Sequence, residues 1–138
     1  MRAAALLLLA ACHRGAPCDD LSGIAHDGSG REWMILDGGD ALAVYPLFPD
    51  APAIAGLEVA PRWIALARDG DHVLGEVARR FGKGATFCEG RAPAHVVGCT
   101  RDALEITLAD PDPPVSFVPP CAWGTPPPPH AEHWTRGE

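Results

Sequence analysis

The sequence predicts a small, mainly β domain: an antiparallel meander that forms a small sandwich or barrel and is stapled by disulfides. Asp-Gly pairs that begin at Asp27, Asp37 and Asp69 lie between apolar segments, and this dipeptide is typical of tight hairpin turns. Residues 104–108 alternate apolar and polar side chains, as a strand with one buried face does. The 138 residues suffice for one such domain.

Three further segments predict strands. Residues 33–36 and 63–66 are apolar on both faces, which indicates central strands that are covered on two sides. Residues 115–118 predict a late strand that is delimited by prolines. The meander therefore extends over most of the chain.

Residues 71–81 fit either a short helix or a hairpin strand. Their apolar side chains share a helical face, and Glu76 and Arg80 have the spacing of an i,i+4 ion pair. Gly75 weakens a helix, and the preceding Asp-Gly pair suits a hairpin. The pattern favours the helix, and the strand remains open.

The N-terminus carries the features of an export signal. Arg2 precedes a short apolar run over residues 3–11, and polar residues follow Cys12. The quartet Leu9, Ala10, Ala11 and Cys12 resembles the lipobox of bacterial lipoprotein precursors. The mature domain itself resembles no family that we recognise.

The resemblance implies that the chain is cleaved before Cys12 and that this cysteine carries the lipid. Two or three acyl chains suffice for stable anchoring, so the lipid bilayer is an expected partner. In this family, aspartate after the modified cysteine favours retention in the inner membrane, and this chain has His13 there. The resemblance therefore implies a lipid-anchored envelope protein, in the outer membrane rather than the inner one, on its periplasmic or surface face.

Four segments follow from composition and from this resemblance. Residues 1–11 are the expected signal peptide, and 12–20 the lipidated tether. Residues 21–123 are the expected β-rich globular domain. Residues 124–138 begin with a proline run, which predicts an extended, solvated tail.

Four of the five cysteines follow Cys12, and export favours two disulfides among them. Three pairings are open. We favour Cys88 with Cys99, joined across a turn at residues 93–94, and Cys18 with Cys121. The spacing lacks the close cysteine pairs of a structural zinc site.

Few residues suggest chemistry. His130, Glu132 and His133 have metal-binding side chains, but on a flexible tail we expect only adventitious binding. Carboxylates in turns are usually solvated and seldom bind calcium, and we expect this of three pairs in the chain. They are Asp37 with Asp40, Asp69 with Asp71, and Asp110 with Asp112. The sequence predicts no catalytic residue, no resident metal and no cofactor.

Other residues leave alternatives open. The loop 45–49 is rich in aromatic residues and proline, and it is either an exposed contact patch or buried under the sheet. His26, Asp27 and Ser29 include the side chains of a hydrolytic triad, but a hairpin turn explains them better than catalysis does.

The net charge of −7 excludes the electrostatic footprint of a nucleic-acid-binding protein. The leading hypothesis is a non-catalytic binding or structural role in the cell envelope, with an unidentified envelope protein or ligand as partner. One alternative is an envelope hydrolase that uses His26, His72 or His95 with acidic partners. Another is a periplasmic inhibitor or immunity-type protein whose acidic surface shields a basic partner.

Overall fold

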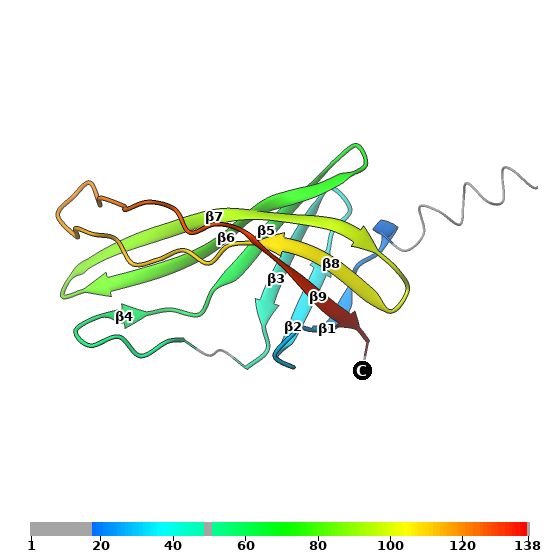
Figure 1. Ribbon diagram of the computed structural model, residues 1–138, viewed down its shortest axis with the longest axis horizontal. Helices are drawn as coiled ribbons and strands as arrows, with labels where there is room; N and C mark the ends of the chain where they lie inside the picture. The colour runs from blue at the N-terminus through cyan, green and yellow to red at the C-terminus, as the bar shows by residue number, and fades with distance from the viewer. Residues whose placement is uncertain (1–17, 49–50, 138) are drawn as a thin grey trace, which may run out of the picture.

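A computed structural model of the protein describes residues 18–48 and 51–137, and the fold is nearly all β (Figure 1). The signal peptide, the lipobox and Cys12 lie outside the described residues. The strands are β1 (Gly23–His26), β2 (Glu32–Asp37), β3 (Ala41–Pro46), β4 (Glu58–Val59), β5 (Trp63–Asp69), β6 (His72–Lys83), β7 (Thr86–Cys99), β8 (Ala103–Leu108) and β9 (His130–Arg136).

Eight of these strands form a closed antiparallel barrel. Apart from the two-residue β4, each strand pairs with its neighbour along the chain, and β9 pairs with β1 to close the ring. The strand β4 pairs with the distal part of β6, beyond the region that β5 covers. The predicted meander is confirmed, and it takes the form of a barrel. Within the described residues, no helix has the length and apolar character needed to cross a membrane.

The three Asp-Gly pairs lie at hairpin turns, as predicted. They connect β1 to β2, β2 to β3 and β5 to β6. The positive φ angles in these turns belong to glycines, and no aspartate has one. In the tightest turn Gly70, with φ of 60°, is the first of two central residues, the place where a type II′ turn needs glycine.

Side chains fill the barrel interior, as is common for eight strands. The rings of Trp33 and Trp134 stack there with centroids 5.1 Å apart, and both residues are almost fully buried. The apolar face of residues 104–108 contributes Leu104, Ile106 and Leu108 to the same core, as its alternation predicts.

The strands at 33–36 and 63–66 exist, but the prediction that both faces are covered is wrong. Trp33 and Ile64 are buried, whereas Leu36 on the outer face is 55% exposed. A closed barrel has one interior, so every strand keeps one face toward solvent.

Residues 71–81 form most of β6, so the favoured helix is wrong and the strand alternative is right. Val73, Val77 and Phe81 are buried, and their spacing of four fits both the helical repeat and the alternation of a strand. Gly75 is required by the strand, because a Cβ there would overlap the carbonyl of Ala65 on β5.

Residues 115–118 form no strand. The segment between β8 and β9 has only an isolated bridge between Ser116 and Ala122, and Val115 and Val118 are each 73% exposed. Prolines on both sides remove the backbone donors that a longer ladder needs.

The predicted tail at 124–138 is also wrong, because residues 130–136 form β9. This strand lies between β1 and β8, and it buries Trp134 in the core. The globular domain therefore extends beyond residue 123, and the proline run 126–129 leads into its last strand. At the other boundary, Cys18 in the expected tether is bonded to the barrel.

The two disulfides join Cys18 to Cys99 and Cys88 to Cys121, so the favoured pairing is wrong. Cys88 and Cys99 both lie in β7, which runs without a turn through residues 93–94. Eleven residues of strand separate their Cα atoms by about 35 Å, far beyond the reach of a disulfide.

Candidate functional site at one end of the barrel

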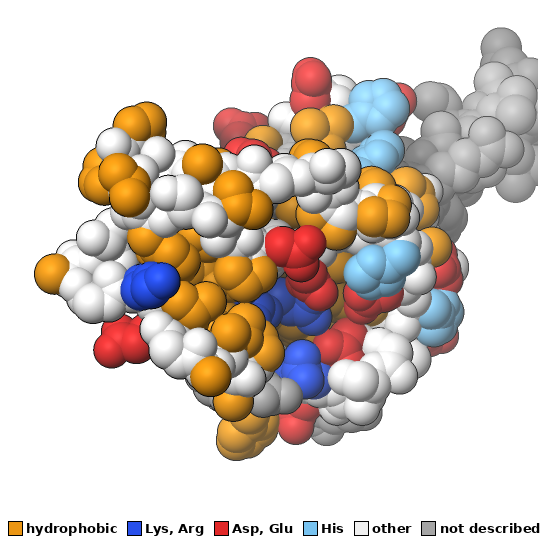
Figure 2. Space-filling model, turned by 60° about the vertical axis from the view of Figure 1, so that its left-hand side comes forward, with side chains coloured by type: hydrophobic (Ala, Val, Ile, Leu, Met, Phe, Trp, Pro, Cys, Tyr) orange, Lys and Arg blue, Asp and Glu red, His pale blue; other side chains and the backbone are white. Residues whose placement is uncertain are grey.

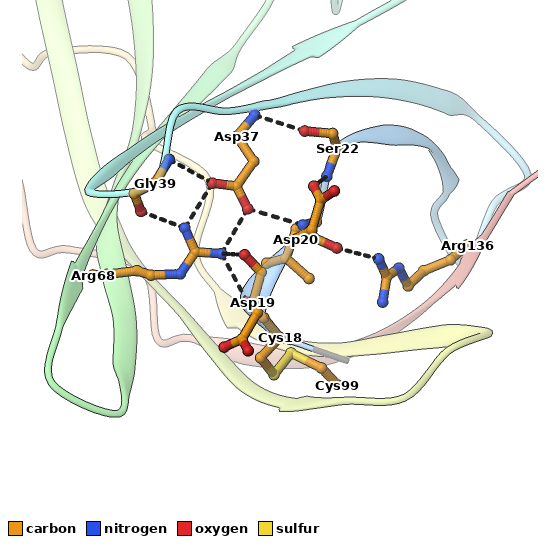
Figure 3. A network of polar contacts seen from close by, with 10 residues as sticks. Cys18, Asp19, Asp20, Ser22, Asp37, Gly39, Arg68, Cys99 and Arg136 are labelled. Atoms are coloured by element: carbon orange, nitrogen blue, oxygen red, sulfur yellow. Dashed lines mark hydrogen bonds and ion pairs between the residues drawn. A yellow bond between two sulfur atoms is a disulfide. The ribbon is translucent and has the colours of Figure 1, made fainter. Parts of the chain in front are cut away.

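An ion pair and several hydrogen bonds cluster at the barrel end where β2 finishes (Figure 3). Arg68 donates to both carboxylate oxygens of Asp37 at 2.6 Å and to the carbonyl of Cys18 at 2.7 Å. Leu21 N donates to Asp37 at 2.9 Å, and Arg136 donates to the carbonyl of Asp20 at 2.7 Å. This cluster attaches the first described residues to the barrel.

At the other end of the barrel lies the buried carboxylate of Asp27, in the turn between β1 and β2. It accepts hydrogen bonds from Ser29 N at 2.9 Å, Ser29 Oγ at 2.6 Å and Arg31 N at 3.0 Å. The indole nitrogen of Trp33 donates to it at 3.0 Å. Burial alone would raise the pKa of Asp27, but these hydrogen bonds outweigh burial and hold it below its ordinary value.

Arg62 lies over the core at this end. Its guanidinium is 4.9 Å from the centroid of the Trp33 ring, within the range of a cation–π contact. It pairs with Asp110, and its Nη2 lies 4.0 Å from Asp27 Oδ2. Only 9% of Arg62 is exposed, so this cation is held mainly by protein groups.

A pocket of about 400 Å³ opens beside Arg62, and we call it the arginine pocket. Arg31 reaches it from the β1–β2 turn, and Arg79 reaches it from β6 with only 8% of its surface exposed. Figure 2 faces this end and shows basic side chains in a hollow, with hydrophobic and acidic side chains around it. The remaining lining residues are Pro52, Ile54, Phe81, Asp110, Pro111, Asp112 and Pro113.

A second pocket, of about 390 Å³, shares residues 111–113 with the arginine pocket. Its floor is β7, where Gly90 allows Pro111 and Trp123 to approach so closely that a Cβ would lie 2.9 to 3.2 Å from them. The disulfide between Cys88 and Cys121 fastens the overlying segment to the same strand. Trp123 remains 42% exposed.

Most of the large exposed apolar side chains among the described residues lie in the segments before β4, at the start of β7 and between β8 and β9, and three of them, Ile54, Val115 and Trp123, line one of the two pockets. We call the whole set the apolar rim. They are Leu47, Phe48, Ile54, Phe87, Val115, Val118 and Trp123. The loop that begins at Tyr45 is therefore exposed in its described part, since Tyr45 is 45% and Phe48 71% exposed.

The structure gives His130 and His133, for which we expected only adventitious metal binding, different partners. His130 contacts Glu132 at 2.5 Å, whereas His133 contacts Glu105 on β8. Among the described residues, no three His, Cys, Asp or Glu side chains are grouped to hold a metal. In two of the predicted carboxylate pairs one member is engaged by an arginine: Asp37 by Arg68 and Asp110 by Arg62.

Of the three histidines proposed for a hydrolase, His26 lies apart from the other two. His72 and His95 are neighbours on β6 and β7, with ring centroids 5.9 Å apart. His26 ends β1 and is paired with Thr135 of β9. Asp27 and Ser29 are hydrogen-bonded within the hairpin turn, as the structural interpretation of that motif predicts.

Sequence reasoning missed the arginine pocket. Its cations come from segments that are remote along the chain and that meet only in the closed barrel. One signal was present: Arg79 and Arg80 are consecutive in a strand, so their side chains must point to opposite faces, and one of them enters the barrel.

Comparison with family models, with curated proteins and with solved structures gave no match.

Proposed function

We propose that the protein is a lipid-anchored protein of the bacterial cell envelope that binds an envelope partner at the barrel end bearing the arginine pocket. One observation carries the proposal: the barrel interior is filled, and the apolar rim gathers at one end together with two pockets. Pockets also lie at the opposite end, beside Leu36 and beside Arg136, so the apolar rim is the feature that distinguishes the pocket end. Exposed apolar side chains that surround pockets are typical of binding surfaces.

The place of the first described residues supports this orientation. Arg31 precedes β2 at the pocket end, whereas Asp37 ends β2 and is linked through Arg68 to Cys18. Figure 1 places the start of the described chain away from the tip of the β6–β7 hairpin. Cys12 precedes Cys18 by a segment that spans at most about 20 Å. A lipid at Cys12 would thus hold the opposite end near the membrane and leave the pockets accessible.

The disulfides also support export. Two bridges join all four cysteines that follow Cys12, and such bridges persist in oxidising compartments. A non-catalytic role agrees with the separation of His26 from the pair formed by His72 and His95.

The anchor is tested by fractionating bacterial cells that produce the protein. We expect the unsubstituted chain in the membrane fraction, with the added mass of acyl chains, and the Cys12→Ser variant in the soluble fraction. An unsubstituted chain that is soluble and carries no fatty acid would refute the anchor.

The binding surface is tested by photo-crosslinking in the same cells. A photoreactive amino acid replaces Phe87 in the apolar rim or, as a matched control, Val97 near the opposite end of the same strand; the native side chains are 55% and 57% exposed. We expect a discrete adduct from position 87 and none from position 97. Equal adducts from both positions, or none from either, would contradict a binding surface at the pocket end.

A further inference from the structure

We infer that residues 89–91 of β7 bind an extended peptide segment of a partner protein, which adds to the sheet as one more strand. We call these residues the open edge. The inference rests on the proposed function and deepens it, because it assigns a mode of recognition to the pocket end of the barrel. It is based on unpaired backbone groups, on a pocket beside them and on a flanking loop that cannot pair with them.

The hairpin of β6 and β7 extends beyond β8 (Figure 1). Pairing of β7 with β8 is confined to the residues from Ala94 onward. Ala109 N donates to the carbonyl of Pro93 at 3.2 Å, so the backbone groups of Pro93 face the β8 side of the strand. Antiparallel strands turn the backbone groups of alternate residues to alternate sides, so Glu89 and Arg91 face that same side.

The backbone groups of the open edge have no partner within the described part of the chain. No described backbone group on the β8 side bonds to residues 86–92, and no described side chain bonds to the backbone of Glu89 or Arg91. The side chains of Glu89 and Arg91 bond to each other at 2.6 Å, and both are exposed on the outer face. The N–H and C=O groups of these two residues are therefore available to an incoming strand.

A pocket borders the open edge. The second pocket, of about 390 Å³, is lined by residues 89–91 and by Val115 and Trp123, which are 73% and 42% exposed. A Cβ on Gly90 would point at the Trp123 ring, and directly opposed residues of neighbouring strands share one face of a sheet. The peptide residue opposite Gly90 therefore directs its side chain toward Trp123, which favours an apolar residue at that position.

The loop between β8 and β9 flanks this edge without pairing with it. Prolines from both of its legs line the pocket, and they are Pro111, Pro113, Pro126 and Pro127. Proline has no N–H, so these residues cannot donate to the carbonyls of the open edge. The loop thus leaves the edge unpaired, as strand addition by a peptide requires.

This arrangement defines the ligand pattern. Peptide residues opposite Glu89 and Arg91 lie on the exposed outer face, whereas the residue between them lies toward Trp123. An extended segment with one apolar residue between two polar ones meets both conditions. The capped peptide acetyl-Ser-Thr-Leu-Thr-Ser-amide has this pattern, with the leucine opposite Gly90, and it is a suitable probe.

The peptide is titrated into the protein, with both disulfides formed, while ¹H–¹⁵N spectra are recorded. At saturation we expect the amide protons of Glu89 and Arg91 to shift downfield and to exchange about tenfold more slowly, whereas the Gly90 amide, which faces β6, changes little. N-methylation of both threonines should abolish binding, because their N–H groups face the edge, and N-methylation of the leucine should not. Equal binding of the two methylated peptides, or unchanged amides at Glu89 and Arg91, would overturn the inference.

Pro93 suggests a matched pair of protein variants. It lies in β7 with the position of its missing N–H on the β8 side, and Arg91→Pro places a second proline in an equivalent position. Arg91→Ala removes the same side chain and keeps the N–H. We expect Arg91→Pro to weaken peptide binding about tenfold and Arg91→Ala to leave it nearly unchanged. Equal effects would refute backbone pairing, and if Arg91→Pro fails to fold, the methylated peptides decide the question with the unsubstituted protein.

A second copy of this chain is the competing occupant of the open edge. Protection of the Glu89 and Arg91 amides without peptide, rising with protein concentration, would assign the edge to self-association and overturn the inference. An adduct from position 87 in cells, together with no effect of the peptide, would refute the open edge and leave the proposed function intact. Peptide binding without any adduct from position 87 would instead support the open edge and contradict the proposed function.

Discussion

The buried carboxylate of Asp37 makes a strong prediction about acid stability. Its side chain is 3% exposed and pairs with Arg68. The hydrogen bond and charge of Arg68 outweigh the effect of burial and hold the pKa of Asp37 well below its ordinary value. The pairing therefore stabilises the fold fully above the unfolded-state pKa of about 4, and this contribution is lost as the pH falls below that value toward the folded-state pKa.

The substitution Asp37→Asn should cost about 3 kcal/mol at pH 7. Removing one partner of a buried ion pair typically costs about 3–5 kcal/mol, and the lower end applies because the Arg68 side chain is 19% exposed. Urea unfolding at pH 7 and at pH 3 measures both effects. We expect the gap between variant and unsubstituted protein to shrink at pH 3, because the unsubstituted protein has by then lost part of the stabilisation.

The control for this experiment is Asp40→Asn, which removes the same charge from an exposed position in the same turn. It should change the free energy of unfolding by less than about 0.5 kcal/mol. If Asp37→Asn unfolds like the unsubstituted protein at pH 7, or if the gap is as large at pH 3, the reasoning about the Arg68 pair is wrong.

Two structural predictions concern covalent and steric constraints. Replacing both Cys18 and Cys99 with alanine opens a loop with a sequence separation of 81, which should lower the free energy of unfolding by about 4.5 kcal/mol in the chain-entropy model; calorimetry without reductant that finds no change would contradict this. Gly75→Ala should lower the free energy of unfolding, measured in urea, by about 2 kcal/mol or more, because the new Cβ would overlap the backbone of Ala65. The control is Gly98→Ala, whose new Cβ would meet only the side chain of Glu105, at 3.7 Å. Equal losses of stability in the two variants would refute the crowding at Gly75.

Local patterns were sufficient where the determining interactions are local. The Asp-Gly turns and residues 104–108 were predicted correctly, since turn geometry and alternation depend on neighbours in the sequence. Residues 71–81 were ambiguous because their apolar spacing serves a helix and a strand alike. The strand at 130–136 was missed because neither of its partners is a sequence neighbour. The strand β1 lies at the other end of the chain, and the proline run separates β9 from β8.

The candidate site could not be predicted, for a related reason. At least one complete strand separates each arginine of the pocket from the next along the chain, and only closure of the barrel brings them to one end. They are Arg31, Arg62 and Arg79. The disulfide pairing depended on the same long-range order, since a continuous β7 keeps Cys88 and Cys99 apart. The sequence gives the positions of the cysteines and charged residues along the chain, but it does not show which of them are in contact in the folded protein.

The position of β9 has a consequence for how this fold is reached. Until residues 130–136 are in place, β1 and β8 each present a free edge of unpaired backbone groups, and Trp33 lacks its stacking partner. Free edges readily recruit strands from other molecules. The barrel therefore cannot close until the last strand has been synthesised. A fragment truncated within the proline run should self-associate instead of remaining monomeric.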